Sequence, residues 1–289
     1  MRTRYFLLFG NGFIGIHAEY LLTMRLKDHL KGRVPDDALR RFSGRFDVVG
    51  DVAIVSVPPE MDAYKPLVAK TILSTRKNVY TVLNKVQKVG SDARTASFEI
   101  LAGETTLTRY REFGFQYRFD VTKVFFTSRM AYERRRVTEQ VEPGETVLVP
   151  FCGVGPFAIP AAARGGRVTA IEKNPEAYGW LRENIILNHV DDSVMAILGD
   201  ATDTGHLLGK RFDRIIIPTP YGMKDSLDIF APFAARDGMI HFYAFGPKNG
   251  MPALVEALEK KGFALTFHDE CGNVAPGIKR WVFDLVKTG

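Results

Sequence analysis

Two glycines and two acidic residues have the types and the spacing needed to bind a nucleoside. Gly153 and Gly155 follow an apolar run, Glu172 ends the next apolar run, and Asp200 ends a third. A carboxylate about 20 residues past such glycines can accept hydrogen bonds from both ribose hydroxyls. Asp200 could accept one from an adenine amino group. Alone, the glycine pair fits a tight turn without a ligand equally well, so the two carboxylates favour the nucleoside site.

These residues are useful only if a particular set of elements positions them. The apolar, β-branched run 146–151 predicts a buried strand, and the glycines and Pro156 predict a turn into a helix over 157–163. The alternation continues with strands at 167–172, 193–198, 213–217 and 239–245, helices at 175–187, 223–234 and 251–262, and a closing strand pair at 263–268 and 281–286. This rhythm predicts an α/β fold with a parallel, doubly wound, Rossmann-like sheet that binds ligands at the strand carboxyl ends.

The first half of the chain differs in composition. Residues 1–140 carry 24 Lys and Arg against 15 Asp and Glu, whereas residues 141–289 carry 15 against 18. Strands at 46–57 and 79–83, a helix at 61–75 and a short antiparallel set at 98–101, 107–110 and 115–119 predict a smaller α+β domain. We therefore predict a basic domain over 24–140 that binds nucleic acid and a catalytic domain over 141–289. Scattered solvated charge is the alternative.

Other features limit the class of protein. Two cysteines among 289 residues provide no disulfide framework, which favours a cytoplasmic location. The apolar stretches within 1–23 are too short and interrupted for a membrane span, and we expect this segment to be an upstream extension with Met24 as the working start. We also predict a monomer without a bound metal.

Motifs throughout 24–289 resemble one family. Residues 147–245 resemble a class I S-adenosylmethionine methyltransferase, and the whole is most similar to archaeal and eukaryotic tRNA guanine-N1 methyltransferases acting beside the anticodon. The wybutosine-pathway aminocarboxypropyl transferases share that fold. The resemblance rests on the motifs FDVVGD at 46–51, LAGE at 101–104, DVTKV at 120–124, YER at 132–134, FCGVGPF at 151–157, EKNPEAY at 172–178, EN at 183–184, LN at 187–188, GMIHFY at 238–243 and APG at 275–277.

The resemblance implies roles for individual residues. Arg94 matches an arginine that holds the guanine O6, which suits a guanidinium fork. Glu133 matches the general base for N1–H, although an ion pair with Arg136 on a solvated helix is an equally simple reading. Arg134 matches a residue that reaches the methionine carboxylate. The resemblance and the glycine turn together imply an S-adenosylmethionine site made of Arg134, Phe151, Gly153, Gly155, Glu172, Lys173, Asp200, Ala201 and Thr219.

Two departures from the family leave the reaction open. Val149 stands where the family has Asp, and Pro218-Thr-Pro-Tyr221 replaces an Asn-Leu-Pro whose Asn contacts the target base. Proline offers no side-chain amide, so either Thr219 or Tyr221 substitutes or the target differs. Methyl transfer to guanine N1 of tRNA is the leading hypothesis. Aminocarboxypropyl transfer and tRNA binding without catalysis are the alternatives. An NAD site would also fit Glu172, with Ala158 in place of the third glycine.

Overall fold

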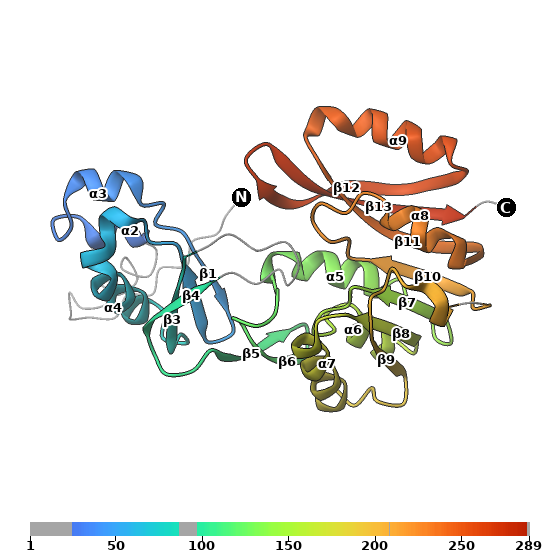
Figure 1. Ribbon diagram of the computed structural model, residues 1–289, viewed down its shortest axis with the longest axis horizontal. Helices are drawn as coiled ribbons and strands as arrows, with labels where there is room; N and C mark the ends of the chain where they lie inside the picture. The colour runs from blue at the N-terminus through green and yellow to red at the C-terminus, as the bar shows by residue number, and fades with distance from the viewer. Residues whose placement is uncertain (1–24, 87–96, 208, 288–289) are drawn as a thin grey trace, which may run out of the picture. The chain divides into compact units, whose positions relative to one another are not determined.

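The computed structural model describes residues 25–86, 97–207 and 209–287. It forms two compact units (Figure 1). Among the described residues, they divide between Thr105 and Thr106. The sequence instead suggested a boundary between residues 140 and 141. The difference arises because the hairpin and the helix before residue 140 pack into the second unit. Each unit is described by itself below.

The first unit is a small sheet with helices packed against it. The strands β1 (Phe46–Val49), β2 (Val52–Val55), β3 (Thr81–Lys85) and β4 (Phe98–Ala102) lie in that order. β2 and β3 are parallel, and the other two pairings are antiparallel. The helices are α2 (Leu26–Leu30), α3 (Asp36–Arg41), η1 (Pro59–Tyr64) and α4 (Lys65–Thr75). Leu30, Met61 and Ile72 from these helices pack with sheet residues in one core. β4 pairs with β3 and not with the strands that follow it. The predicted antiparallel set at 98–101, 107–110 and 115–119 is therefore wrong for its first strand.

The second unit is built on a seven-stranded sheet. Its strands are β7 (Thr146–Pro150), β8 (Arg167–Glu172), β9 (Val194–Leu198), β10 (Phe212–Ile217), β11 (Ala234–Gly246), β12 (Phe263–Ala275) and β13 (Ile278–Lys287). The spatial order is β12-β13-β11-β10-β7-β8-β9 (Figure 1). Five strands, β7 to β11, are parallel, whereas β13 is antiparallel to both β11 and β12. The predicted doubly wound α/β sheet is confirmed. The order of the strands changes direction at β7, with β8 and β9 on one side of it and β10 and β11 on the other.

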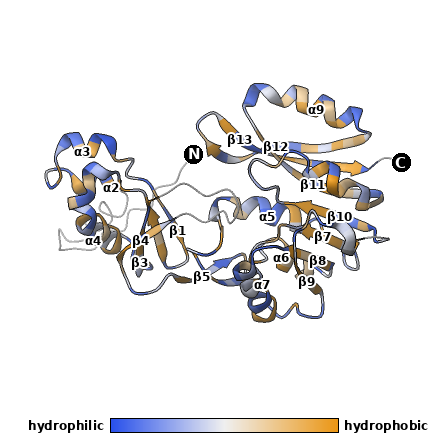
Figure 2. Cartoon of the chain, viewed as in Figure 1, coloured by the Kyte–Doolittle hydropathy of each residue, from blue (hydrophilic) through white to orange (hydrophobic). Residues whose placement is uncertain are grey.

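Helices cover this sheet and explain its apolar strands. They are α6 (Ala158–Ala163), α7 (Pro175–Leu187), α8 (Ser226–Phe230) and α9 (Met251–Lys260), with single turns η3 (Thr204–Leu207), η4 (Ala231–Phe233) and η5 (Lys248–Gly250). The central strands are hydrophobic along their length (Figure 2). Val147, Leu148 and Val149 are all fully buried, as expected of a strand covered on both faces. No described helix is long and apolar enough to cross a bilayer.

A hairpin and a short helix connect to this unit ahead of β7. The hairpin strands β5 (Leu107–Glu112) and β6 (Phe115–Asp120) are antiparallel, and η2 (Ser128–Met130) leads into α5 (Ala131–Thr138). Asn184 of α7 and Asn188, the residue that caps this helix at its C-terminus, hold β6. The Asn184 amide accepts from Arg118 N at 2.7 Å and donates to Arg118 O at 3.1 Å, and Asn188 does the same with Gln116 at 2.9 and 2.7 Å. These side chains replace a neighbouring strand, which places the hairpin in the second unit.

Candidate functional site

The glycine turn after β7 has the backbone that the sequence predicts. Phe151, Gly153 and Gly155 have φ of 55°, 57° and 94°. A Cβ at Gly155 would lie 2.8 Å from side-chain carbons of both Ile159 and Leu181, so this glycine is required by packing as well as by its dihedral. A Cβ at Gly153 would meet nothing within 4 Å. The turn is therefore packed tightly against α6 and α7 at Gly155 and open at Gly153.

Glu172 joins the ends of β7 and β8. Its Oε2 accepts a hydrogen bond of 2.8 Å from the Gly153 N–H, and its Oε1 accepts one of 2.8 Å from the Asn174 N–H. Asn174 in turn caps α7 by accepting from Glu176 N at 3.0 Å. A carboxylate has about four acceptor positions, so Glu172 retains capacity for ribose hydroxyls. Its half-buried position at the strand end fits the predicted role, which stays a prediction.

Asp200 lies at the same edge, beyond β9. It accepts from Thr202 N at 3.0 Å, from Thr202 Oγ1 at 2.8 Å and from Lys173 Nζ at 3.2 Å. The Thr202 hydrogen bonds, helped by Lys173, hold the pKa of Asp200 below its usual value, so the carboxylate is ionised at neutral pH. Ala201 beside it is buried. Four predicted residues, Glu172, Lys173, Asp200 and Ala201, thus meet where β8 and β9 end.

The segment after β10 holds Thr219, which was predicted to contact the cofactor, and Tyr221. Thr219 is buried, and its hydroxyl lies 3.1 Å from Ser226 Oγ and 3.3 Å from Ile217 O. This hydroxyl is therefore engaged inside the second unit. Tyr221, the other candidate substitute for the family Asn, has a largely exposed ring that packs edge-on against Phe245 at 5.2 Å. Of the two, Tyr221 is the more accessible.

Arg134 is buried and engaged by protein groups. Its Nε donates to Glu112 Oε1 at 2.7 Å, its Nη2 also donates to that carboxylate, and its Nη1 donates to Thr127 O at 3.0 Å. The guanidinium lies over the Phe126 ring at 5.1 Å. The predicted contact of Arg134 with a methionine carboxylate stays a prediction. Nothing in the sequence spacing identified Glu112 as the partner of Arg134. It lies 22 residues earlier, and the fold of the β5–β6 hairpin brings the two side chains together.

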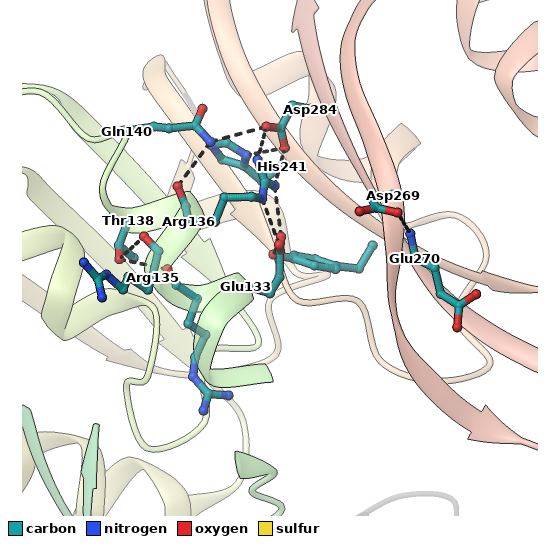
Figure 3. Close-up of polar contacts among 11 residues, drawn as sticks. Glu133, Arg135, Arg136, Thr138, Gln140, His241, Asp269, Glu270 and Asp284 are labelled. Atoms are coloured by element: carbon teal, nitrogen blue, oxygen red, sulfur yellow. Dashed lines mark hydrogen bonds and ion pairs between the residues drawn. The ribbon is translucent and has the colours of Figure 1, made fainter. Parts of the chain in front are cut away.

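Glu133 has two sets of hydrogen-bond donors. Arg136 donates to it from Nε at 2.8 Å and from Nη2 at 2.9 Å (Figure 3). Tyr243 OH donates to its Oε1 at 2.8 Å. The Glu133 side chain is only 11% exposed. Burial, with the nearby Glu133 charge, raises the pKa of Tyr243 well above its ordinary value, so the phenol is a neutral donor. The alternative ion pair with Arg136 is thus present, but on a mostly buried carboxylate instead of a solvated helix face.

Arg136 extends this contact into a buried network. It donates to Asp284 from Nη1 at 2.6 Å and from Nη2 at 2.9 Å. Asp284 is also 2.7 Å from His241 Nδ1, and His241 Nε2 is 2.7 Å from Arg214 Nη1. Arg214 is paired with Glu145 at 2.8 and 3.0 Å. Sequence reasoning missed this network, although a histidine and an aspartate inside two apolar strands were a usable signal.

Two further expectations concern what the structure does not place or contain. Arg94 lies outside the described residues, so its expected role at O6 stays a prediction. Within the described ranges, no group of three His, Cys, Asp or Glu side chains is arranged to hold a metal ion.

Comparison with known proteins identifies two matching family models. Residues 108–264 match the TRM5/TYW2 methyltransferase domain, and residues 26–106 match the TYW2 N-terminal domain. The two matches meet near the division between the structural units.

Individual relatives agree with these matches. The chain is 37% identical over 217 residues to tRNA (guanine(37)-N(1))-methyltransferase Trm5b of Pyrococcus abyssi, covering 75% of this chain and 64% of that one. It spans about half to two thirds of the length of the first curated relatives. The crystal structure of P. abyssi Trm5b matches with a TM-score of 0.78 and 34% identity over 89% of this chain and 78% of that chain. The structure of P. horikoshii TYW2 in complex with MeSAdo matches with a TM-score of 0.73 and 27% identity over 91% and 97%.

Proposed function

Because this chain belongs to the TRM5/TYW2 methyltransferase family, we propose that it transfers a methyl group from S-adenosylmethionine to N1 of guanine 37 in tRNA. The observation that carries the proposal is the meeting of Gly153, Glu172 and Asp200 at one edge of the parallel sheet. A relative with 37% identity is named for this reaction. The resemblance read from the sequence motifs points to the same activity.

The residues at the sheet edge fit the cofactor. Glu172 has acceptor capacity for the ribose hydroxyls, and ionised Asp200 can accept from the adenine amino group. The open backbone at Gly153 lets a ligand approach without meeting a Cβ. When bound, S-adenosylmethionine supplies an electrophilic methyl group. A solved TYW2 relative carries MeSAdo, which supports an adenosyl ligand for this fold.

The work of the protein is to orient the guanine and remove its N1 proton. We assign proton removal to Glu133, whose carboxylate is mostly buried and oriented by Arg136 and Tyr243. We retain Arg94 as the group that holds O6, where a planar guanidinium would offset the charge that develops as N1 loses its proton. The rate of in-line attack of N1 on the methyl group then depends mainly on the positioning of the two reactants and on Glu133 as the base.

Aminocarboxypropyl transfer from the same cofactor is the second candidate. Three observations favour it. Residues 26–106 match a domain named for TYW2, and Pro218 replaces the asparagine of the guanine methyltransferases. The solved P. horikoshii TYW2 is also covered over 97% of its length, against 78% for Trm5b. This reaction would require the cofactor's γ-carbon, in place of its methyl group, to face the nucleophile.

Nucleoside mass analysis separates these candidates. The purified protein is incubated with tRNA and isotopically labelled S-adenosylmethionine, and the tRNA is digested. Methylation predicts labelled 1-methylguanosine. Aminocarboxypropyl transfer predicts a nucleoside heavier by that larger group and requires a wyosine-type precursor. A protein that binds tRNA and cofactor but produces neither product would be a binding protein without catalysis. The monomeric state, the cytoplasmic location and the absence of a metal or membrane partner remain part of the proposal.

A further inference from the structure

One guanidinium is shared by two carboxylates. Arg136 lies between Glu133 of its own helix and Asp284 of β13, with two hydrogen bonds to each (Figure 3). Its Nη2 donates to both partners at 2.9 Å, so the two contacts use one rigid fork. The Asp284 side chain is 4% exposed, whereas that of Glu133 is 11% exposed. Asp284 is thus the inner anchor and Glu133 the outer partner.

Asp284 is itself held in a defined state by its neighbours. Arg214 can only donate, so His241 Nε2, 2.7 Å away, must accept. The imidazole is therefore neutral, with its proton on Nδ1, and it donates to Asp284. Burial lowers the pKa of His241, in agreement with this tautomer. Burial alone would raise the pKa of Asp284, but the hydrogen bonds from Arg136 and His241 outweigh it and hold the carboxylate ionised.

The arrangement has a consequence for a proton arriving at Glu133. If Arg136 had only Glu133 as its partner, protonating Glu133 would leave a partly buried cation without a counter-ion, which is strongly unfavourable. Because Asp284 keeps two hydrogen bonds to Arg136, the guanidinium stays neutralised whether Glu133 is charged or not. Asp284 thus lowers the cost of protonating Glu133.

Other titratable groups face the cluster of Glu133, Arg136 and Asp284, and each has a defined charge or hydrogen bond there. On β11, Tyr243 donates to Glu133 and stabilises its ionised form. On β12, burial raises the pKa of Cys271 to about 12, so this thiol is neutral. On β13, Arg280 is a further cation near Cys271 and Tyr243, and its pKa is lowered by burial. On β10, Arg214 is neutralised by Glu145. Tyr243 and Asp284 therefore affect Glu133 in opposite directions.

We propose that Asp284 is a positioning residue that acts through Arg136 to make Glu133 an effective proton acceptor, and that Tyr243 opposes it. This inference rests on the proposed methyl transfer, in which Glu133 takes the N1 proton. Neither Asp284 nor Tyr243 needs to touch the substrate. Asp284 keeps Arg136 paired after proton transfer, whereas the Tyr243 hydroxyl fixes the orientation of the carboxylate before it.

The test is the pH dependence of single-turnover methylation with saturating enzyme and S-adenosylmethionine. Asp284→Asn should move the acid limb of the rate profile to lower pH by about one unit and lower the plateau rate by up to about tenfold, because Glu133 becomes a weaker base. Tyr243→Phe removes one donor to ionised Glu133 and should move the same limb to higher pH. Asp213→Asn is the matched control, since the hydrogen bonds of this β10 aspartate within the described part of the chain go to Thr146 and not to the network.

The outcomes separate this inference from the proposed function. Glu133→Gln should abolish the acid limb, and a wild-type protein without methylation, or an unchanged Glu133→Gln profile, would reject the proposed function itself. If the limb depends on Glu133 but does not move in Asp284→Asn, the positioning role is wrong. If Asp284→Asn does not fold, as judged by thermal unfolding and cofactor binding, Tyr243→Phe decides, because an unmoved or downward-shifted limb would overturn the inference.

Discussion

The carboxylate of Glu172 accepts a 2.8 Å hydrogen bond from the backbone N–H of Gly153, across the ends of two neighbouring parallel strands. One residue therefore has two functions, because Glu172 both orders the glycine turn and remains available to a ribose. The second oxygen holds the first residues of α7 through Asn174 N. A substitution of Glu172 should consequently weaken ligand binding and local order at this edge together.

Replacement of Glu172 should weaken cofactor binding. We expect S-adenosylmethionine to bind with a Kd on the order of micromolar, and Glu172→Ala to reduce the binding free energy by about 1–3 kcal/mol through lost charge-assisted hydrogen bonds. Isothermal titration calorimetry measures the change. Glu176→Ala, which removes an exposed carboxylate from the first turn of α7, is the control. Equal affinities for wild type and Glu172→Ala would remove Glu172 from the site.

The two glycines of the turn should respond differently to alanine. At Gly155 the new Cβ would overlap Ile159 and Leu181, whereas at Gly153 it would meet only the cost of a positive φ. We expect Gly155→Ala to lower the free energy of unfolding by about 1–3 kcal/mol more than Gly153→Ala, because overpacking adds to the backbone strain. Urea denaturation of the two variants measures the difference. Equal losses would mean that the packing at Gly155 relaxes freely.

Replacing one partner of the buried ion pair Arg134–Glu112 should lower the stability of the protein strongly. Their side chains are only 4% and 5% exposed. Arg134→Met should destabilise the protein by about 3–5 kcal/mol, since it leaves Glu112 buried without a counter-charge. Adding Glu112→Leu should recover much of this loss. Thermal unfolding of the single and double variants gives the coupling. If Arg134 instead serves the cofactor, Arg134→Met should be well folded but unable to bind it.

Acid should weaken the fold through His241, because burial holds its imidazole neutral in the folded protein. The folded-state pKa of His241 is lowered by burial, so its contribution to stability is complete above the unfolded value of about 6.5 and declines as the pH falls below it. His241→Gln should flatten the fall in unfolding free energy between about pH 6.5 and 5. His189→Gln, which changes an exposed histidine, should leave the slope unchanged. Urea unfolding at several pH values measures the slopes, and identical slopes in His241→Gln and wild type would contradict this account.

RNA binding should be electrostatic. The excess of Lys and Arg in residues 1–140 predicts a tRNA affinity that falls steeply with salt, with a slope in log Kd of about one per phosphate contact. Fluorescence anisotropy between low and moderate salt measures it. An affinity that does not change with salt would exclude the basic half as the main contact surface.

Sequence reasoning predicted the parallel strands of the second unit because local patterns determine them. The strand–turn–helix at 146–163 and the helix α7 (Pro175–Leu187), which begins at a proline, are each specified by neighbouring residues. The partners of Arg134 and Arg136 were not accessible in this way. Asp284 and His241 meet because β11 and β13 pair in a register that places them opposite each other. Such a register depends on the completed sheet and not on any local pattern.

The boundary between the units was missed for a related reason. Pro143 and Gly144 are typical turn residues, but they mark only the loop before β7. The preceding hairpin is held by the amides of Asn184 and Asn188, about 70 residues later in the chain. A side chain that replaces a strand neighbour has no periodic signature in the sequence.

The position of β13 between β11 and β12 bears on how the protein is made. Both strands that β13 separates are synthesised before it, so a nascent chain has β11 exposed at an open edge until β13 emerges from the ribosome. An unpaired edge is a template for association with other chains. We therefore expect the incomplete chain to need protection during translation, and the anchor for Arg136 to reach its place only after β11 and β12 have been synthesised.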